Sequence, residues 1–98
     1  MTRQIVFHEM AEEELNDAAH FYESEVKGLG QTFLNEVEKT VLHIQQYPVA
    51  APFILDIIRR KPMHQFPYSI MYSYDDNIIR ILAVANQKRR PLYWRKRK

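Results

Sequence analysis

Two groups of basic side chains stand out in the second half of this chain. Residues 86–98 read NQKRRPLYWRKRK, with seven Lys or Arg and no acid, and residues 59–61 form an Arg-Arg-Lys cluster. Cations gathered in one patch bind phosphate groups, and aromatic rings beside them stack on unpaired bases. The candidate target-binding residues are therefore Arg59, Arg60, Lys61, Lys88, Arg89, Arg90, Tyr93 and Trp94.

A metal-free ribonuclease would use many of the same side chains for chemistry. Lys and Arg would stabilise the negative charge that develops around phosphorus, and a histidine or tyrosine would transfer the proton. Under this hypothesis the catalytic residues are Arg59, Lys61, His64, Arg89 and Tyr93. The plainer alternative is a solubilising basic rim, with Tyr93 and Trp94 packed onto the core.

The sequence lacks the residues that other kinds of active site or metal site require. The chain has no cysteine, and its four histidines are too far apart in sequence to form a ligand-spaced pair. It also has no glycine-rich phosphate loop, no GxSxG and no HExxH. Glu12, Glu13 and Glu14 are consecutive, so on a helix they spread around it, and we interpret them as a solvated face. We expect no metal and no cofactor.

The charge of the chain is divided between its halves. Residues 1–58 carry three basic and ten acidic side chains, a net charge of −7, whereas residues 59–98 carry eleven basic and two acidic ones, a net charge of +9. This asymmetry indicates an anionic partner for the second half, either nucleic acid or an acidic protein. The alternative is that the two halves neutralise each other in the folded domain.

Length and hydrophobicity favour one domain. Ninety-eight residues with 46% apolar content suit a single domain over residues 1–98, with residues 95–98 frayed at the end. Neither a signal peptide nor a stretch of about 20 apolar residues is visible, so we expect a cytoplasmic protein that does not enter a membrane.

Periodicity predicts two helices after a short first strand at residues 3–8. Apolar residues recur at spacings of three and four from Ala11 to Val26, and again from Phe33 to Tyr47, where Pro48 ends the pattern. The only two glycines, Gly28 and Gly30, lie between these segments. The two helices should therefore form an antiparallel hairpin.

Three strands should follow the helices. Residues 54–58 have strand character and lead into the basic cluster, and Pro62 closes this strand. Residues 66–74 alternate between two kinds of side chain with a period of two. Residues 78–85 are almost continuously apolar. Residues 75–77 (Asp-Asp-Asn) make the turn of a hairpin between the last two. A meander of these strands would bring both basic groups to the same end of the sheet.

These elements predict an α+β domain in the order strand, helix, helix, strand, strand, strand. The helical hairpin would pack on one face of a mainly antiparallel four-stranded sheet and leave the other, partly polar face free. The pattern leaves open which strand neighbours the first one.

Several motifs together resemble a known family. They are the first-helix residues Ala11, Glu14, Leu15, Ala18, Phe21 and Tyr22, the turn GLGQTF, then Pro48, the segment FPYSIMY and the ending ILAVANQKRRPLYW. In order and spacing they resemble the RelE/ParE superfamily of toxins from type II toxin-antitoxin systems of the plasmid stabilisation type, nearer the ParE-like branch. The resemblance implies the fold just described, a cognate antitoxin that wraps the toxin, and a toxin-antitoxin hetero-oligomer.

The two branches of that superfamily imply different targets: DNA gyrase for ParE-like toxins, and messenger RNA on the ribosome for RelE-like ribonucleases. RelE-like members use an arginine after the Pro-Tyr of the third strand on phosphate, and this chain has Ser69 there. Many relatives have a histidine where this chain has Asn86. Arg89 and Tyr93 lie near the positions of a C-terminal arginine and tyrosine in RelE-like enzymes.

Three functional hypotheses follow. The first is a ParE-like toxin that inhibits DNA gyrase by binding, without catalysis, and is neutralised by an antitoxin. The second is a RelE-like ribosome-dependent endoribonuclease, and the third is a basic nucleic-acid-binding module whose affinity falls steeply with salt.

Overall fold

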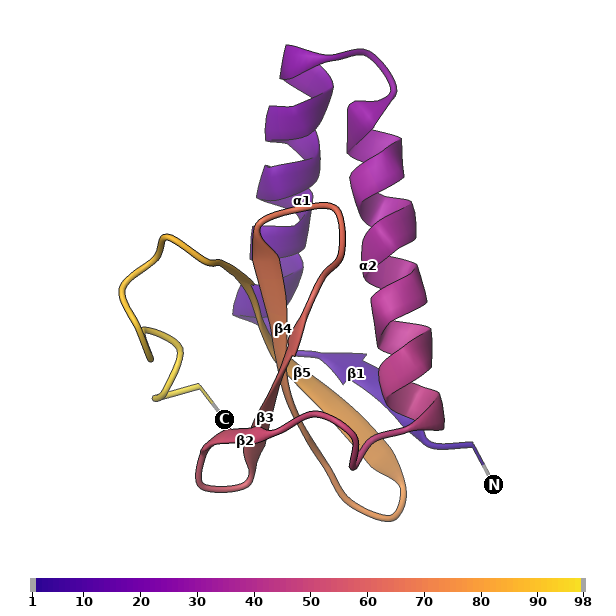
Figure 1. Ribbon diagram of the computed structural model, residues 1–98, viewed down its shortest axis with the longest axis vertical. Coiled ribbons are helices and arrows are strands. Elements are labelled where there is room, and N and C mark those ends of the chain that lie inside the picture. The colour runs from indigo at the N-terminus through magenta and orange to yellow at the C-terminus, as the bar shows by residue number, and fades with distance from the viewer. Residues whose placement is uncertain (1, 98) are drawn as a thin grey trace.

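Seven helices and strands make up the computed structural model, which describes residues 2–97. A helical hairpin lies against a five-stranded mixed sheet, so the predicted α+β class is confirmed (Figure 1). In chain order the elements are β1 (Gln4–Phe7), α1 (Glu9–Glu25), α2 (Leu29–Gln46), β2 (Phe53–Leu55), β3 (Ile58–Pro62), β4 (Tyr68–Tyr74) and β5 (Ile78–Asn86). None of the helices in the described part of the chain is both long and apolar enough to cross a membrane.

The helical hairpin is set by its two glycines and one carboxylate. Gly28 adopts φ +88°, a left-handed conformation that glycine takes at little cost. A Cβ atom on Gly30 would lie 2.6 Å from the Ala19 carbonyl oxygen, so only glycine lets α1 and α2 approach this closely. The Glu23 carboxylate accepts hydrogen bonds from the Gly28 and Gly30 N–H groups, at 2.8 and 3.0 Å, and caps the start of α2.

The sheet has the order β1-β5-β4-β3-β2. The predicted meander of the last three strands is confirmed, because β4 pairs antiparallel with both β3 and β5. The neighbour of the first strand, which the sequence left open, is β5, and the two run parallel, with Gln4 opposite Ile78 and Phe7 opposite Ile81.

The predicted number of four strands is wrong, because the segment expected as one strand forms two. Asp56 takes φ +49° and reverses the chain, so β2 and β3 make a tight antiparallel hairpin with Ile57 exposed at its tip. Aspartate tolerates this left-handed conformation better than most residues. As a result the basic cluster at residues 59–61 lies within β3 and not after a strand.

A hydrophobic core lies on each face of the sheet. The larger one packs the helices against β4 and β5 around Phe33, Ile70, Tyr72 and Ile81. The smaller one lies on the opposite face, where Met71, Leu82, Ala83, Ala85 and Trp94 are buried together.

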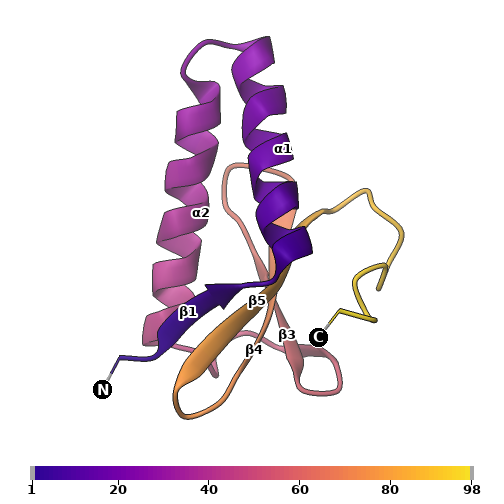
Figure 2. The ribbon, with the colours of Figure 1, turned by 180° about the vertical axis from the view of Figure 1, so that it is seen from behind.

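The prediction of a free second face is therefore wrong. The chain after β5, residues 87–97, which we call the C-terminal arm, turns back and covers this face (Figure 2). The physical reason is that Leu92 and Trp94 are apolar enough to bury the strand residues that the helices cannot reach.

Candidate functional site

Only part of the first basic group lies beside the start of the C-terminal arm. Arg60 pairs with Met71 and Lys61 with Ile70, and the same β4 residues pair with Ala83 and Val84 of β5. The end of β3 and the end of β5 thus flank the start of β4. The arm begins there, and Arg60 lines one cavity with Arg89 and Arg90, whereas Arg59 contacts the connection between α2 and β2.

Arg59 is engaged in holding the chain together. Its Nη1 donates hydrogen bonds to the carbonyl oxygens of Val49 and Ala51, at 3.0 and 2.6 Å. Its guanidinium also lies 3.8 Å from the centre of the Phe53 ring. These contacts fix the connection between α2 and β2 and give this cation a structural role.

Arg60 lies on the opposite face of β3, beside the arm. It lines a cavity of about 170 Å³ together with Ser69, Asn86, Arg89 and Arg90. Ser69 is 1% exposed, and its hydroxyl has no hydrogen-bond partner among residues 2–97. Lys61 is half-buried on β3, and His64 is exposed in the loop that follows.

The start of the arm is a turn built on Asn86. The Asn86 side chain accepts a hydrogen bond from the Lys88 N–H at 2.8 Å, and its backbone carbonyl accepts one from the Arg89 N–H at 3.0 Å. Lys88, Arg89 and Arg90 are all exposed on this turn. The Arg89 guanidinium stacks on the Tyr93 ring, 3.9 Å from its centre.

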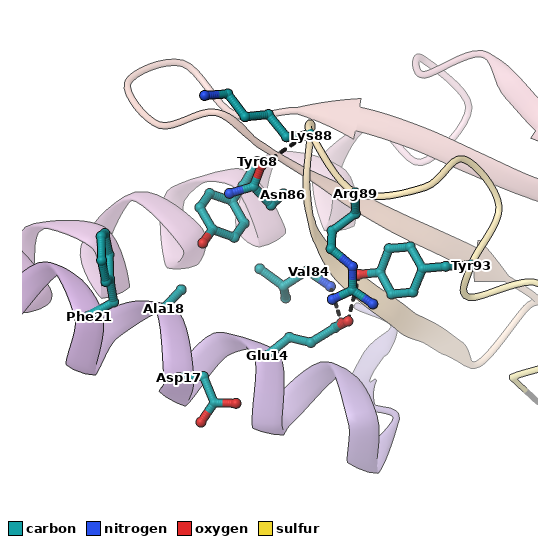
Figure 3. Close-up of a pocket in the computed structure, with 10 residues that line it drawn as sticks. All are labelled: Glu14, Asp17, Ala18, Phe21, Tyr68, Val84, Asn86, Lys88, Arg89 and Tyr93. Atoms are coloured by element: carbon teal, nitrogen blue, oxygen red, sulfur yellow. Dashed lines mark hydrogen bonds between the residues drawn. The ribbon is translucent and has the colours of Figure 1, made fainter.

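A carboxylate from α1 fastens the arm. The Tyr93 hydroxyl donates to Glu14 Oε2 at 2.5 Å, and the two terminal nitrogens of Arg97 donate to the two Glu14 oxygens at 2.8 and 3.0 Å. The Val84 N–H of β5 also donates to Glu14, at 3.1 Å (Figure 3). One side chain therefore joins α1, β5 and the arm.

Two expectations from the sequence are wrong here. Glu14 does not belong to a solvated face, because its side chain is only 15% exposed and takes part in this network. Arg97 is not frayed, because it forms a two-pronged ion pair with Glu14 and also donates to the Leu82 carbonyl oxygen at 3.0 Å. Lys98, also expected to be frayed, lies outside the described residues.

Tyr93 is held in its neutral form. Burial, the hydrogen bond to Glu14 and the charge of that carboxylate together raise the pKa of Tyr93 well above its usual range. Such a phenol donates a hydrogen bond but does not readily give up its proton to a base near neutral pH. Its geometry suits a structural contact better than proton transfer.

Trp94 is buried, at 2% exposure, in the core under the arm. In this position its ring has no free face on which a base could stack. The target-binding roles that the sequence assigned stay predictions. Within residues 2–97, no three His, Asp or Glu side chains gather as they would to hold a metal ion.

A groove of about 440 Å³ runs between α1 and the end of β5 (Figure 3). Its apolar surface comes from Ala18, Phe21 and Val84. Lys88 and Arg89 of the arm border one side of it, and the acids Glu14 and Asp17 border the other. The groove therefore combines an apolar surface with charges of both signs at its edges.

Sequence reasoning missed the role of Glu14, although a signal was present. Position 14 lies three residues after Ala11 and four before Ala18, both of which are buried on α1. A charged residue on the apolar stripe of a helix needs a partner, and the cations of the arm supply one.

Comparison with known structures supports the fold described above. A solved structure of the "Chromosomal ParDE TA system from P. aeruginosa" superposes on this chain with a TM-score of 0.72. The match covers 87% of this chain and 96% of that one, at 17% sequence identity. The two chains therefore share a fold over most of their length.

The family follows from the sequence itself. The family model described as "ParE toxin of type II toxin-antitoxin system, parDE" matches residues 5–91, and the chain belongs to this family. The resemblance predicted from the motifs is thereby confirmed, including the ParE-like branch. A search of curated proteins found no match to this chain.

Proposed function

We propose that this protein inhibits DNA gyrase by binding to it through the basic C-terminal arm, and that a cognate antitoxin neutralises it. The observation that carries the proposal is the arm itself. It presents Lys88, Arg89 and Arg90 to solvent on a turn that is fastened to the body of the domain. Membership of the ParE toxin family favours gyrase as the target.

Binding agrees with the geometry better than ribonuclease chemistry does. Arg59 donates two hydrogen bonds to backbone carbonyl oxygens, and the Tyr93 hydroxyl donates one to Glu14. Position 69, where RelE-like enzymes place an arginine on phosphate, is a buried serine without charge. An exposed cationic turn needs no acid or base to recognise an acidic surface.

An acidic antitoxin segment would complete the toxin-antitoxin complex. The groove between α1 and the arm has an apolar surface with two cations on one side, and Glu14, one of the two acids on the other side, is already paired with Arg97. Since gyrase acts on chromosomal DNA, the same proposal assigns the protein to the cytoplasm.

A supercoiling assay with purified gyrase tests the proposal. The wild-type protein should inhibit supercoiling, and the double substitution Lys88→Ala, Arg90→Ala should weaken inhibition about tenfold, because each exposed ion pair contributes up to about 1 kcal/mol. The control is Lys39→Ala, an exposed cation on α2, which should inhibit as the wild type does. Supercoiling that continues unchanged at concentrations that arrest growth would overturn the proposal.

Two further measurements separate the other hypotheses. Cleavage of messenger RNA in the ribosomal A site, detected by toe-printing, would identify a RelE-like ribonuclease. Binding to bare DNA or RNA that weakens steeply with salt, without gyrase inhibition, would identify a nucleic-acid-binding module.

A further inference from the structure

We propose that Glu14 is a positioning residue that sets the orientation of the basic arm and thereby the inhibition of the target. The proposal rests on the function proposed above, because it concerns the presentation of the same arm. Glu14 itself faces the interior, so it acts through the arm residues that it holds and not by touching the target.

The first step of the argument is the edge of β5. β1 ends at Phe7, opposite Ile81, and beyond this point β5 has no neighbouring strand on that side. Two side chains take over there: Glu14 accepts from the Val84 N–H at 3.1 Å, and Arg97 donates to the Leu82 carbonyl at 3.0 Å. The Glu14–Arg97 ion pair therefore covers the part of the strand edge that β1 leaves bare.

The second step is the attachment of the arm. Its polar contacts to α1 converge on one carboxylate, which receives the Tyr93 hydroxyl and both prongs of Arg97. Without this carboxylate, the Val84 N–H, the Tyr93 hydroxyl and the Arg97 guanidinium would all lose a partner while partly buried. The apolar contact of Leu92 and Trp94 with the sheet would then hold the arm alone, and it should open more often.

The third step connects Glu14 with the exposed cations. Arg89 stacks on the Tyr93 ring at 3.9 Å, and the hydroxyl of the same ring is held by Glu14. A continuous chain of contacts thus runs from Glu14 through Tyr93 to Arg89. Releasing the carboxylate should let the turn of residues 88–90 move relative to α1 and lose its fixed geometry.

The experiment replaces Glu14 by Gln, which keeps the size of the side chain but removes its charge. We expect Glu14→Gln to weaken gyrase inhibition about tenfold or more. Trypsin should cleave the arm after Lys88 and Arg89 several times faster than in the wild type. The emission of Trp94, the only tryptophan of the chain, should shift to longer wavelength as the indole meets water. The far-ultraviolet circular dichroism spectrum should stay unchanged.

Two controls separate positioning from a general loss of stability. Glu13→Gln changes the exposed neighbour and should behave as the wild type in every measurement. Val41→Ala, in the core on α2 and away from the arm, should lower the unfolding midpoint but leave inhibition, arm cleavage and Trp94 emission unchanged. If Glu14→Gln does not fold, Arg97→Gln breaks the same ion pair from the arm and should reproduce the effects in weaker form.

The outcomes distinguish this inference from the function on which it rests. If the wild-type protein leaves gyrase untouched, the proposed function fails, while arm cleavage and Trp94 emission still decide whether Glu14 fastens the arm. The inference is overturned if Glu14→Gln keeps full inhibition, or if its arm is as protected as that of the wild type. An equal loss of inhibition in Val41→Ala would also overturn it.

Discussion

Trp94 offers a direct measure of how firmly the C-terminal arm is docked. Its indole is 2% exposed and packs with Met71, Leu82, Ala83 and Ala85 on the face of the sheet that the helices leave open. An aromatic side chain buries about 150–250 Å², which at about 25 cal/mol per Å² corresponds to about 4–6 kcal/mol. Measured Trp→Ala substitutions in cores cost about 3–5 kcal/mol.

The free energy of docking the arm sets an upper limit on the stability that Trp94→Ala can lose. Once the arm of a variant is detached, weakening its contacts further changes nothing in the folded state, so the measured loss cannot exceed the free energy of docking the arm. We therefore expect Trp94→Ala to lower the free energy of unfolding by about 3 kcal/mol, at the low end of the measured range. The slope of unfolding with urea should also fall, because the folded variant already exposes the second face of the sheet.

Urea unfolding followed by circular dichroism measures both quantities, since the variant has no tryptophan to report fluorescence. With a slope of about 1.5 kcal/mol per M, the midpoint should fall by about 2 M. Phe21→Ala, an aromatic residue on α1 that is 56% exposed, is the matched control and should change the stability by about 0.5 kcal/mol or less. A Trp94→Ala midpoint within about 0.3 M of the wild type would refute the docked arm.

Three further predictions concern the same fold. Because the pKa of Tyr93 is raised, the folded chain keeps a phenol proton that the unfolded chain loses near pH 10. The contribution of Tyr93 to stability is complete below that pH and should fade above it. Urea midpoints measured from pH 8 to 11 should therefore decline less in Tyr93→Phe than in the wild type. Gly30→Ala should lower the free energy of unfolding by about 2 kcal/mol in urea titrations, because its Cβ would meet the Ala19 carbonyl at 2.6 Å. Arg59→Ala should cost about 2 kcal/mol by the same assay through two lost hydrogen bonds, whereas Lys61→Ala should cost about 0.5 kcal/mol or less.

The sequence predicted the helices and the hairpin of β4 and β5 because their signals are local. Apolar residues at spacings of three and four, two glycines between the helices and Pro48 after them identify α1 and α2 within a few residues of their observed ends. The turn at Asp75 was equally readable, and its carboxylate accepts from the N–H groups of Asn77 and Ile78.

The sequence failed where distant segments decide the structure. Nothing near Asp56 signals a reversal, since isoleucines lie on both sides of it and no glycine is present, so one strand was expected instead of two. The parallel pairing of β1 with β5 joins residues at the two ends of the chain and leaves no local mark. The cover over the second face also depends on contacts between the arm and the strands before it.

The candidate site was predicted in composition but not in the state of its side chains. The meander places Arg60 beside the arm, but Arg59 contacts the connection between α2 and β2 instead. Whether a cation is already bonded depends on which groups the fold places beside it. Arg59 holds two carbonyls and Arg97 holds Glu14, and neither contact follows from residue type or spacing.

The pairing of the two chain ends bears on how the protein is made. Arg97 and Glu14, which are 83 residues apart, meet only after nearly the whole chain has left the ribosome, and β1 likewise waits for β5. The helical hairpin and the β4–β5 hairpin close short loops and can form early, whereas contacts of such long sequence separation form late. An unfinished chain thus has neither a docked arm nor a complete sheet. Docking of the arm would therefore wait until Arg97 has left the ribosome.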